Sequence, residues 1–149
     1  MKMLLAGQWV GREKVINVHD PWDDSVVDTV PQANLKDVET ALAAADAARG
    51  TARAMTAYER SQILLKTAAI VADRLEDFAR TIASEGSKTI REARKEARRC
   101  VNTLTIAGEE AKRLLGETIP FDSFPGGEDR RGHFERVPVG VVLAITPFN

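Results

Sequence analysis

The run GVVLAIT, residues 140–146, restricts the possible folds more than any other part of the chain. It is continuously apolar, rich in β-branched side chains, and bounded by Gly140 and Pro147. Such a run is typical of a β-strand that is covered on both faces, as in a parallel α/β sheet. A strand of this kind needs neighbouring strands and helices, and only Pro147, Phe148 and Asn149 follow it. We therefore expect the chain to be the N-terminal part of a longer fold.

The remaining sequence predicts short strands followed by helices. Residues 3–31 alternate Val, Ile and Thr with turn formers, which predicts strands. Apolar side chains that recur every three or four residues predict three helices, over 35–48, from 56 or 57 to about 82, and over 89–115. The second helix should bend or break near Arg74, and Gly116 suits the position that follows the third. Residues 123–132 predict a loop, and residues 133–137 predict an exposed strand.

Composition excludes several classes of protein. Apolar residues make up 44% and charged residues 29% of the chain, and the net charge of −1 attracts neither nucleic acid nor an anionic membrane. No apolar run approaches the length of about 20 residues that spans a bilayer. A single cysteine excludes an internal disulfide and favours a cytoplasmic location. His19 and His133 lie far apart without other ligands at metal-site spacing, so we expect no metal.

Three features could carry chemistry, and each has a structural alternative. Asn149 follows a strand end and a Pro-containing turn, where its amide could donate to an oxyanion or could simply cap the turn. Cys100 could be a nucleophile, but its position beside a helical apolar seam favours a buried structural thiol. The basic stretch 90–99 could bind an anion. Its interleaved Glu92 and Glu96 favour a solvated, salt-bridged helix face.

The segment VPVGVVLAITPFN, residues 137–149, resembles a block of the NAD(P)-dependent aldehyde dehydrogenase superfamily, P-V-G-V-x-x-x-I-x-P-[FW]-N. Further stretches resemble other family motifs, namely LLAGQWV (4–10), HDPWDD (19–24), Arg60 with Ile63 and Leu64, EGSK (85–88) and GETIP (116–120). Two positions depart from the family pattern. Asp24 and Ser87 each stand where the family usually has glycine.

The resemblance implies an α/β fold of which this chain forms the N-terminal part, rich in helix and with short strands. Residues 1–117 would then hold the N-terminal strands and the helical part of the cofactor-binding domain. Residues 118–138 would form an oligomerisation hairpin, through which we expect a homodimer or homotetramer. Residues 139–149 would begin the Rossmann-like dinucleotide-binding sheet.

The resemblance also implies roles for the last residues. In the family a cysteine thiolate attacks the aldehyde, and an asparagine side chain together with a backbone N–H holds the resulting oxyanion. Asn149 matches that asparagine, and Ile145, Thr146, Pro147 and Phe148 match residues that border NAD or NADP. The family's nucleophilic cysteine, general-base glutamate and cofactor-binding lysine lie beyond the point that matches Asn149. Cys100 does not match the nucleophile's motif.

Three hypotheses for function follow. The first is the N-terminal portion of an oxidoreductase that converts a small aldehyde, with anionic aldehydes among the candidates, to a carboxylic acid; this portion alone would be inactive. The second is a catalytically inactive truncated relative that acts as an oligomerisation partner. The third is a helical module whose face over residues 91–99 binds an anion. The first explains both the apolar strand and the motif block, and we prefer it.

Overall fold

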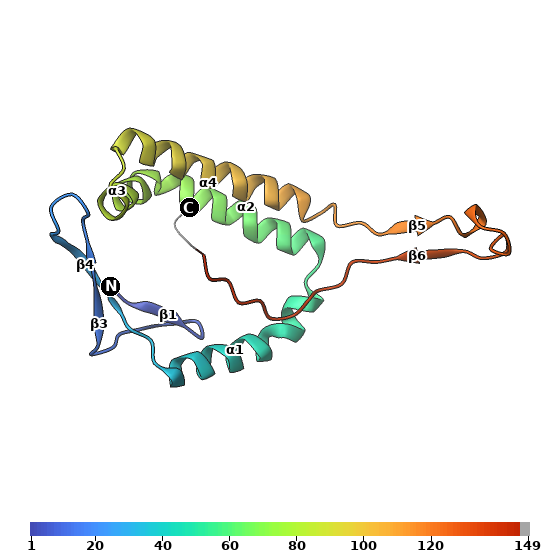
Figure 1. The fold of residues 1–149 in the computed structure, drawn as a ribbon, viewed down its shortest axis with the longest axis horizontal. Coiled ribbons are helices and arrows are strands. Elements are labelled where there is room, and N and C mark those ends of the chain that lie inside the picture. Colours follow the sequence, from blue (N-terminus) through green and yellow to red (C-terminus); the bar gives the residue numbers. More distant parts are fainter. Residues whose placement is uncertain (147–149) are drawn as a thin grey trace.

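The computed structural model describes residues 1–146 and shows an open arrangement of hairpins and helices (Figure 1). Within these residues, six short strands form three separate antiparallel pairs. The pairs are β1 (Met3–Leu5) with β2 (Gln8–Val10), β3 (Val15–His19) with β4 (Val26–Pro31), and β5 (Glu117–Ile119) with β6 (Gly132–Phe134). The chain is thus rich in helix with short strands, as the sequence predicts.

Helices α2 (Ala57–Asp73), α3 (Leu75–Gly86) and α4 (Ile90–Glu110) pack against one another. The predicted break near Arg74 is confirmed, because this residue separates α2 from α3. The buried residues of these helices and of the turn after α4 are mostly small: Ser61, Ala68, Val71, Ala79, Ala93, Ala97, Gly108 and Ala111. Small side chains let helix backbones approach closely. At Gly108 an added Cβ would lie 3.0 Å from the Leu65 side chain.

Helix α1 (Leu35–Ala54) lies apart from this bundle (Figure 1). Asn34 caps it in a reciprocal capping box with Asp37. The apolar side chains of its expected stripe are exposed, with Leu35 at 75% and Leu42 at 55%. The amphipathic pattern therefore predicts the helix correctly, although residues 1–146 do not cover its apolar face.

Two helix ends differ from the sequence prediction. Helix α1 continues to Ala54 instead of ending at residue 48. Gly50 lies inside it, and a single glycine in a helix interior costs only about 1 kcal/mol. Helix α4 ends at Glu110 and not at Leu115. Gly116 consequently does not follow a helix. It opens the third hairpin, where a Cβ would lie 1.9 Å from the Phe134 carbonyl oxygen.

The strand predictions near the C-terminal end are wrong for the described residues. The strand expected over 133–137 is confined to Gly132–Phe134. Residues 140–146 form no strand, and they are exposed. A strand is defined by backbone hydrogen bonds to a neighbour, and none of the six strands in residues 1–146 pairs with this segment.

The third hairpin projects from the helices as an arm (Figure 1). Its tip holds a short 3₁₀ turn, Phe121–Ser123, and an exposed Phe124. The sequence predicts a hairpin and loop in this region, and both are present. No helix within residues 1–146 has the length and apolar character needed to cross a lipid bilayer.

Candidate functional site

The predicted cofactor-bordering residues lie on the segment that follows the arm. This segment runs back between α1 and the α2–α4 pair (Figure 1). Ile145 is 85% exposed, and Thr146 is exposed as well. Pro147, Phe148 and Asn149 lie outside the described residues, so the oxyanion role of Asn149 stays a prediction.

The same segment forms one wall of a groove of about 650 Å³. Opposite it stand small α1 side chains, Ala45, Ala48 and Ala52. Four arginines also line the groove: Arg49, Arg53, Arg60 and Arg136. We call this feature the arginine groove. No sequence pattern predicts it, because its arginines come from three separate segments and form no local motif.

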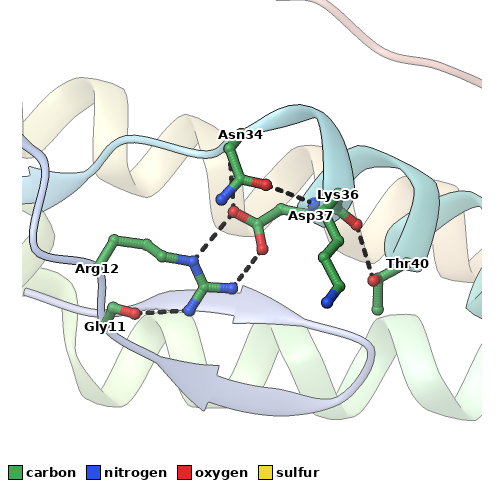
Figure 2. A network of polar contacts seen from close by, with 6 residues as sticks. All are labelled: Gly11, Arg12, Asn34, Lys36, Asp37 and Thr40. Atoms are coloured by element: carbon green, nitrogen blue, oxygen red, sulfur yellow. Dashed lines mark hydrogen bonds and ion pairs between the residues drawn. The ribbon is translucent and has the colours of Figure 1, made fainter.

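A polar network attaches α1 to the N-terminal hairpins (Figure 2). The Arg12 guanidinium donates from Nε to Asp37 Oδ2 at 3.1 Å and from Nη2 to Asp37 Oδ1. Asp37 Oδ2 also accepts from the Asn34 N–H at 3.0 Å, and Asn34 Oδ1 accepts from the Asp37 N–H at 3.1 Å. The Asp37 side chain is only 5% exposed. This pair therefore fixes the start of α1.

Charge pairing in this network shifts the titration of Asp37. The hydrogen bonds from Arg12, followed by the one from the Asn34 N–H, lower the pKa of the Asp37 carboxyl. The carboxylate in turn raises the pKa of Arg12. Both groups are thus held in their charged forms. Asp37 already uses both oxygens within the protein, which indicates a structural role and not a catalytic one.

Cys100 lies on α4 with its residue exposed, so the predicted burial is wrong. Within residues 1–146 no hydrogen bond or ion pair joins either histidine to Cys100. His19 Nδ1 lies 3.0 Å from an Asp24 carboxylate oxygen, and His133 Nε2 lies 3.8 Å from Glu135. Within residues 1–146, no group of three His, Cys, Asp or Glu side chains is placed to hold a metal ion.

The basic stretch at the start of α4 is salt-bridged, as expected. Arg94 donates two hydrogen bonds to Glu76 of α3, at 2.7 Å and 3.0 Å. These bonds lower the pKa of Glu76 and raise the pKa of Arg94. Lys95 pairs with Glu92 at 3.2 Å, and Lys88 pairs with Glu96. Carboxylates thus already neutralise much of this face, which argues against the anion-binding module.

The two departures from the family motifs share one backbone property. Asp24 has a φ of 60° and Ser87 has a φ of 51°, so both adopt the left-handed conformation. Glycine occupies this region without steric cost, whereas other residues are strained there. Asp24 and Ser87 therefore hold a conformation that favours glycine, at some cost in stability.

Comparison with known proteins gives a consistent result. The sequence profile of the "Aldehyde dehydrogenase family" matches residues 9–149. Aspartate-semialdehyde dehydrogenase 1 of Pseudomonas canavaninivorans is 40% identical over 137 residues, which cover 92% of this chain and 29% of that protein. 3-Sulfolactaldehyde dehydrogenase of Priestia aryabhattai is 41% identical over 148 residues, which cover 99% of this chain and 30% of that protein.

A solved structure agrees with the arrangement of the elements. Aldehyde dehydrogenase 21 from Physcomitrella patens, in complex with the reaction product succinate, matches with a TM-score of 0.82 and 36% identity. The match covers 89% of this chain and 28% of that chain. The chain thus spans about 30% of the length of the relatives it matches. The profile match, the sequence identities and the structural similarity together show that the chain belongs to the aldehyde dehydrogenase family.

Proposed function

We propose that this chain takes part in the NAD(P)-dependent oxidation of a small anionic aldehyde to a carboxylic acid. The observation that carries the proposal is the family match, which runs through residue 149 and includes the block 137–149. In this proposal residues 1–117 belong to the cofactor-binding domain, residues 118–138 form an oligomerisation arm, and residues 139–149 begin the dinucleotide-binding sheet.

Asn149 has the central chemical role in the proposal. Its side-chain N–H donates a hydrogen bond to the oxyanion that appears when a thiolate attacks the aldehyde carbon. A donor aimed at charge that develops only after attack lowers the barrier without tightening substrate binding. Ile145 and Thr146, which are exposed and able to contact a ligand, border the cofactor together with Pro147 and Phe148. When bound, NAD or NADP supplies the hydride acceptor.

The relatives support an anionic substrate. Their names specify aspartate semialdehyde and 3-sulfolactaldehyde, and the moss structure contains succinate as its product. Each of these molecules carries a carboxylate or sulfonate in addition to the reacting group. We extend this shared chemistry to the present chain and propose a cytoplasmic enzyme, which agrees with its single cysteine.

We further propose that residues 1–149 alone oxidise no aldehyde. Cys100 is the chain's one cysteine, it does not match the motif of the family's nucleophile, and within residues 1–146 no hydrogen bond or ion pair joins it to a histidine. The chain would act with the parts of the family fold that carry the nucleophile and base. The alternative is a catalytically inactive oligomerisation partner that associates through the arm. An absence of activity both in residues 1–149 alone and in residues 1–149 joined to the rest of a relative would favour it.

A chimera tests the role of Asn149. Residues 1–149 replace the matching segment of the Priestia 3-sulfolactaldehyde dehydrogenase, which aligns with 99% of this chain. NAD(P)H formation from 3-sulfolactaldehyde is followed by absorbance. Asn149→Ala should lower kcat by about 100- to 1,000-fold, as loss of one oxyanion donor does in other enzymes. KM should change little, because the bond forms after attack.

Asn102→Ala is the matched control, since Asn102 is an exposed asparagine on α4. It should leave both kinetic parameters unchanged. A chimera that is active and keeps its kcat in the Asn149→Ala variant would contradict the proposed role. Aldehyde turnover by purified residues 1–149 without the relative's sequence would contradict the proposed inactivity of this chain alone.

A further inference from the structure

Arg60 holds the corner between α1 and α2. Its Nη1 donates a hydrogen bond to the Met55 carbonyl oxygen at 2.7 Å. Met55 is the residue at which α1 ends, and the next residue, Thr56, caps α2. Carbonyl groups at the end of a helix have no partner within that helix, so they accept such bonds from side chains. The Arg60 side chain therefore ties the start of α2 to the end of α1.

The Arg60 guanidinium has more N–H donors than this one bond uses. Its Nε is buried and has no acceptor in the part of the chain that the structure describes. A buried donor without an acceptor is costly. The bond to Met55 thus accounts for one side of the guanidinium, and Nε is left to bind a second acceptor close to the corner.

The segment that leads into the apolar run 140–146 lies in the same groove. Arg60 lines the arginine groove together with Val137, Pro138, Gly140, Val141 and Val142. The side chains of these five residues are apolar, so main-chain carbonyls are the acceptors that they can offer. Within residues 1–146, no main-chain hydrogen bond reaches the carbonyls of residues 137–142. This wall of the groove therefore holds acceptors of the kind that Nε requires.

The sequence of the run 140–146 does not by itself fix its register in a sheet. Register is normally set by alternation of apolar and polar side chains, because a slip of one residue turns every side chain to the other face. This run is apolar on both faces, so a slip changes little in burial. The same slip would turn the Asn149 side chain away from the oxyanion. A contact at the entry to the run is needed to exclude it.

The backbone at this entry has a defined turn. Gly140 has a φ of 101°, a conformation that side chains other than glycine rarely adopt. A Cβ at Gly140 would meet nothing within 4 Å, so the backbone conformation and not a lack of space favours glycine there. The entry to the run is thus shaped separately from the apolar residues that follow it.

We propose that Arg60 is a positioning residue for Asn149. Its Nε donates to a main-chain carbonyl within residues 137–142, while Nη1 stays on the Met55 carbonyl. These two bonds fix the register of the strand against the α1–α2 corner, and the strand then aims the Asn149 amide at the oxyanion. Arginine suits this task because its planar fork holds two acceptors in a fixed geometry, which lysine cannot do. This inference rests on the proposed function, in which residues 139–149 begin the sheet.

A double-mutant cycle in the chimera described above tests the proposal. Arg60→Met should lower kcat by up to about 100-fold with little change in KM, as small misplacements of a catalytic group do. In the Asn149→Ala background the same substitution should lower kcat by less than about twofold, because the donor that Arg60 positions is already absent. Arg60→Lys, which keeps the charge but not the fork, should behave like Arg60→Met. Arg53→Met, at an exposed arginine of the same groove, is the control and should leave kcat unchanged.

Hydrogen exchange of the chimera gives a readout that does not depend on turnover. Amides of residues 139–146 should exchange faster in Arg60→Met than in the unsubstituted chimera, and Arg53→Met should not change them. Unchanged exchange in Arg60→Met would overturn the proposal. Circular dichroism checks that each variant retains its helices.

The kinetic outcomes separate this inference from the proposed function. An equal loss of kcat in both backgrounds would show that Arg60 stabilises the fold in general and would overturn its positioning role. Full kcat in Arg60→Met or Arg60→Lys would overturn it as well, and the role of Asn149 would still stand if Asn149→Ala lowers kcat. Full kcat in Asn149→Ala would contradict the proposed function, and the positioning role would fall with it.

Discussion

Two parts of this molecule carry apolar sequence patterns that predict buried helices or strands, but they differ in how far their apolar side chains are buried. The bundle of α2, α3 and α4 buries small residues between its helices, with Ala79 and Ala93 fully covered, although Ile63, Ile70 and Ile106 stay exposed. The other part, α1 with residues 137–146, leaves its apolar side chains exposed. We call these parts the closed bundle and the open face. Their difference shows that an amphipathic pattern predicts an element, while burial depends on whether a partner surface is present.

The way each part is held together also differs. The closed bundle relies on small residues that bring helix backbones close, and exposed ion pairs such as Glu76 with Arg94 add to it. In the open face, one partly buried ion pair, Arg12 with Asp37, holds the start of α1. Apolar packing is spread over many contacts, whereas a single polar pair can be removed by one substitution.

The largest expected effect comes from overpacking the closed bundle. Ala93→Leu adds a large side chain to a fully buried site on α4 and should destabilise the chain by about 1–3 kcal/mol. Ala48→Leu is the matched change on α1, where the residue is exposed, and should alter stability by less than about 0.5 kcal/mol. Urea denaturation of both variants measures the difference. Equal costs would remove the distinction between the two parts.

The next effect concerns the attachment of α1. Asp37→Asn removes the charge that pairs with Arg12, so α1 amides should exchange faster at pH 7 while those of α2 and α4 change little. Asp46→Asn, on the exposed side of α1, is the control and should change neither. Hydrogen exchange resolved by residue makes this measurement. If the amides of α2 and α4 exchanged faster by the same factor as those of α1, the Arg12–Asp37 pair would not act on α1 alone, and this account of its attachment would be contradicted.

The pH dependence of this pair has a defined sign. Because the folded pKa of Asp37 is lowered, its stabilising contribution is fully present above the unfolded-state pKa of about 3.9. It is lost as pH falls through the lowered folded pKa. The difference between wild type and Asp37→Asn should therefore shrink in acid. A difference that stays constant from neutral pH to well below the unfolded-state pKa would exclude the carboxylate charge as its cause.

Sequence reasoning succeeds where the signal is local. The break at Arg74 and the N-cap at Asn34 are predictable because both depend on side chains a few residues apart. The strand predicted over 140–146 is wrong in residues 1–146 because strand formation needs a neighbour that no local pattern guarantees. Spacing alone places Cys100 in the apolar seam of α4, yet the partner helices leave it exposed.

The arginine groove is not predictable for a related reason. Arg53, Arg60 and Arg136 come together only through the path of the chain after the arm. The Arg12 and Asp37 pair likewise joins residues that are 25 positions apart. No periodicity in the sequence connects such residues. By contrast, the family block 137–149 is contiguous, so the amino-acid sequence by itself is enough to indicate the family.

The smallest expected effect concerns the turn that ends α3 in the closed bundle. Ser87 ends α3 in the left-handed conformation, and Ser87→Gly should stabilise the chain by up to about 1 kcal/mol. Ser87→Ala, which keeps the strain and removes the hydroxyl, is the control and should not stabilise it. Thermal denaturation compares the two. A Tm that falls in the glycine variant would show that the left-handed turn is not the source of strain.

Native-state hydrogen exchange of the wild-type chain at neutral pH tests the distinction between the two parts most directly. Amides in the interior of α2 and α4 should exchange only through global unfolding, because they belong to the closed bundle. Amides of α1 should open far more readily, and those of residues 137–146 should exchange almost as fast as in an unfolded chain. Protection of α1 and residues 137–146 equal to that of α2 and α4 would contradict the division into a closed bundle and an open face.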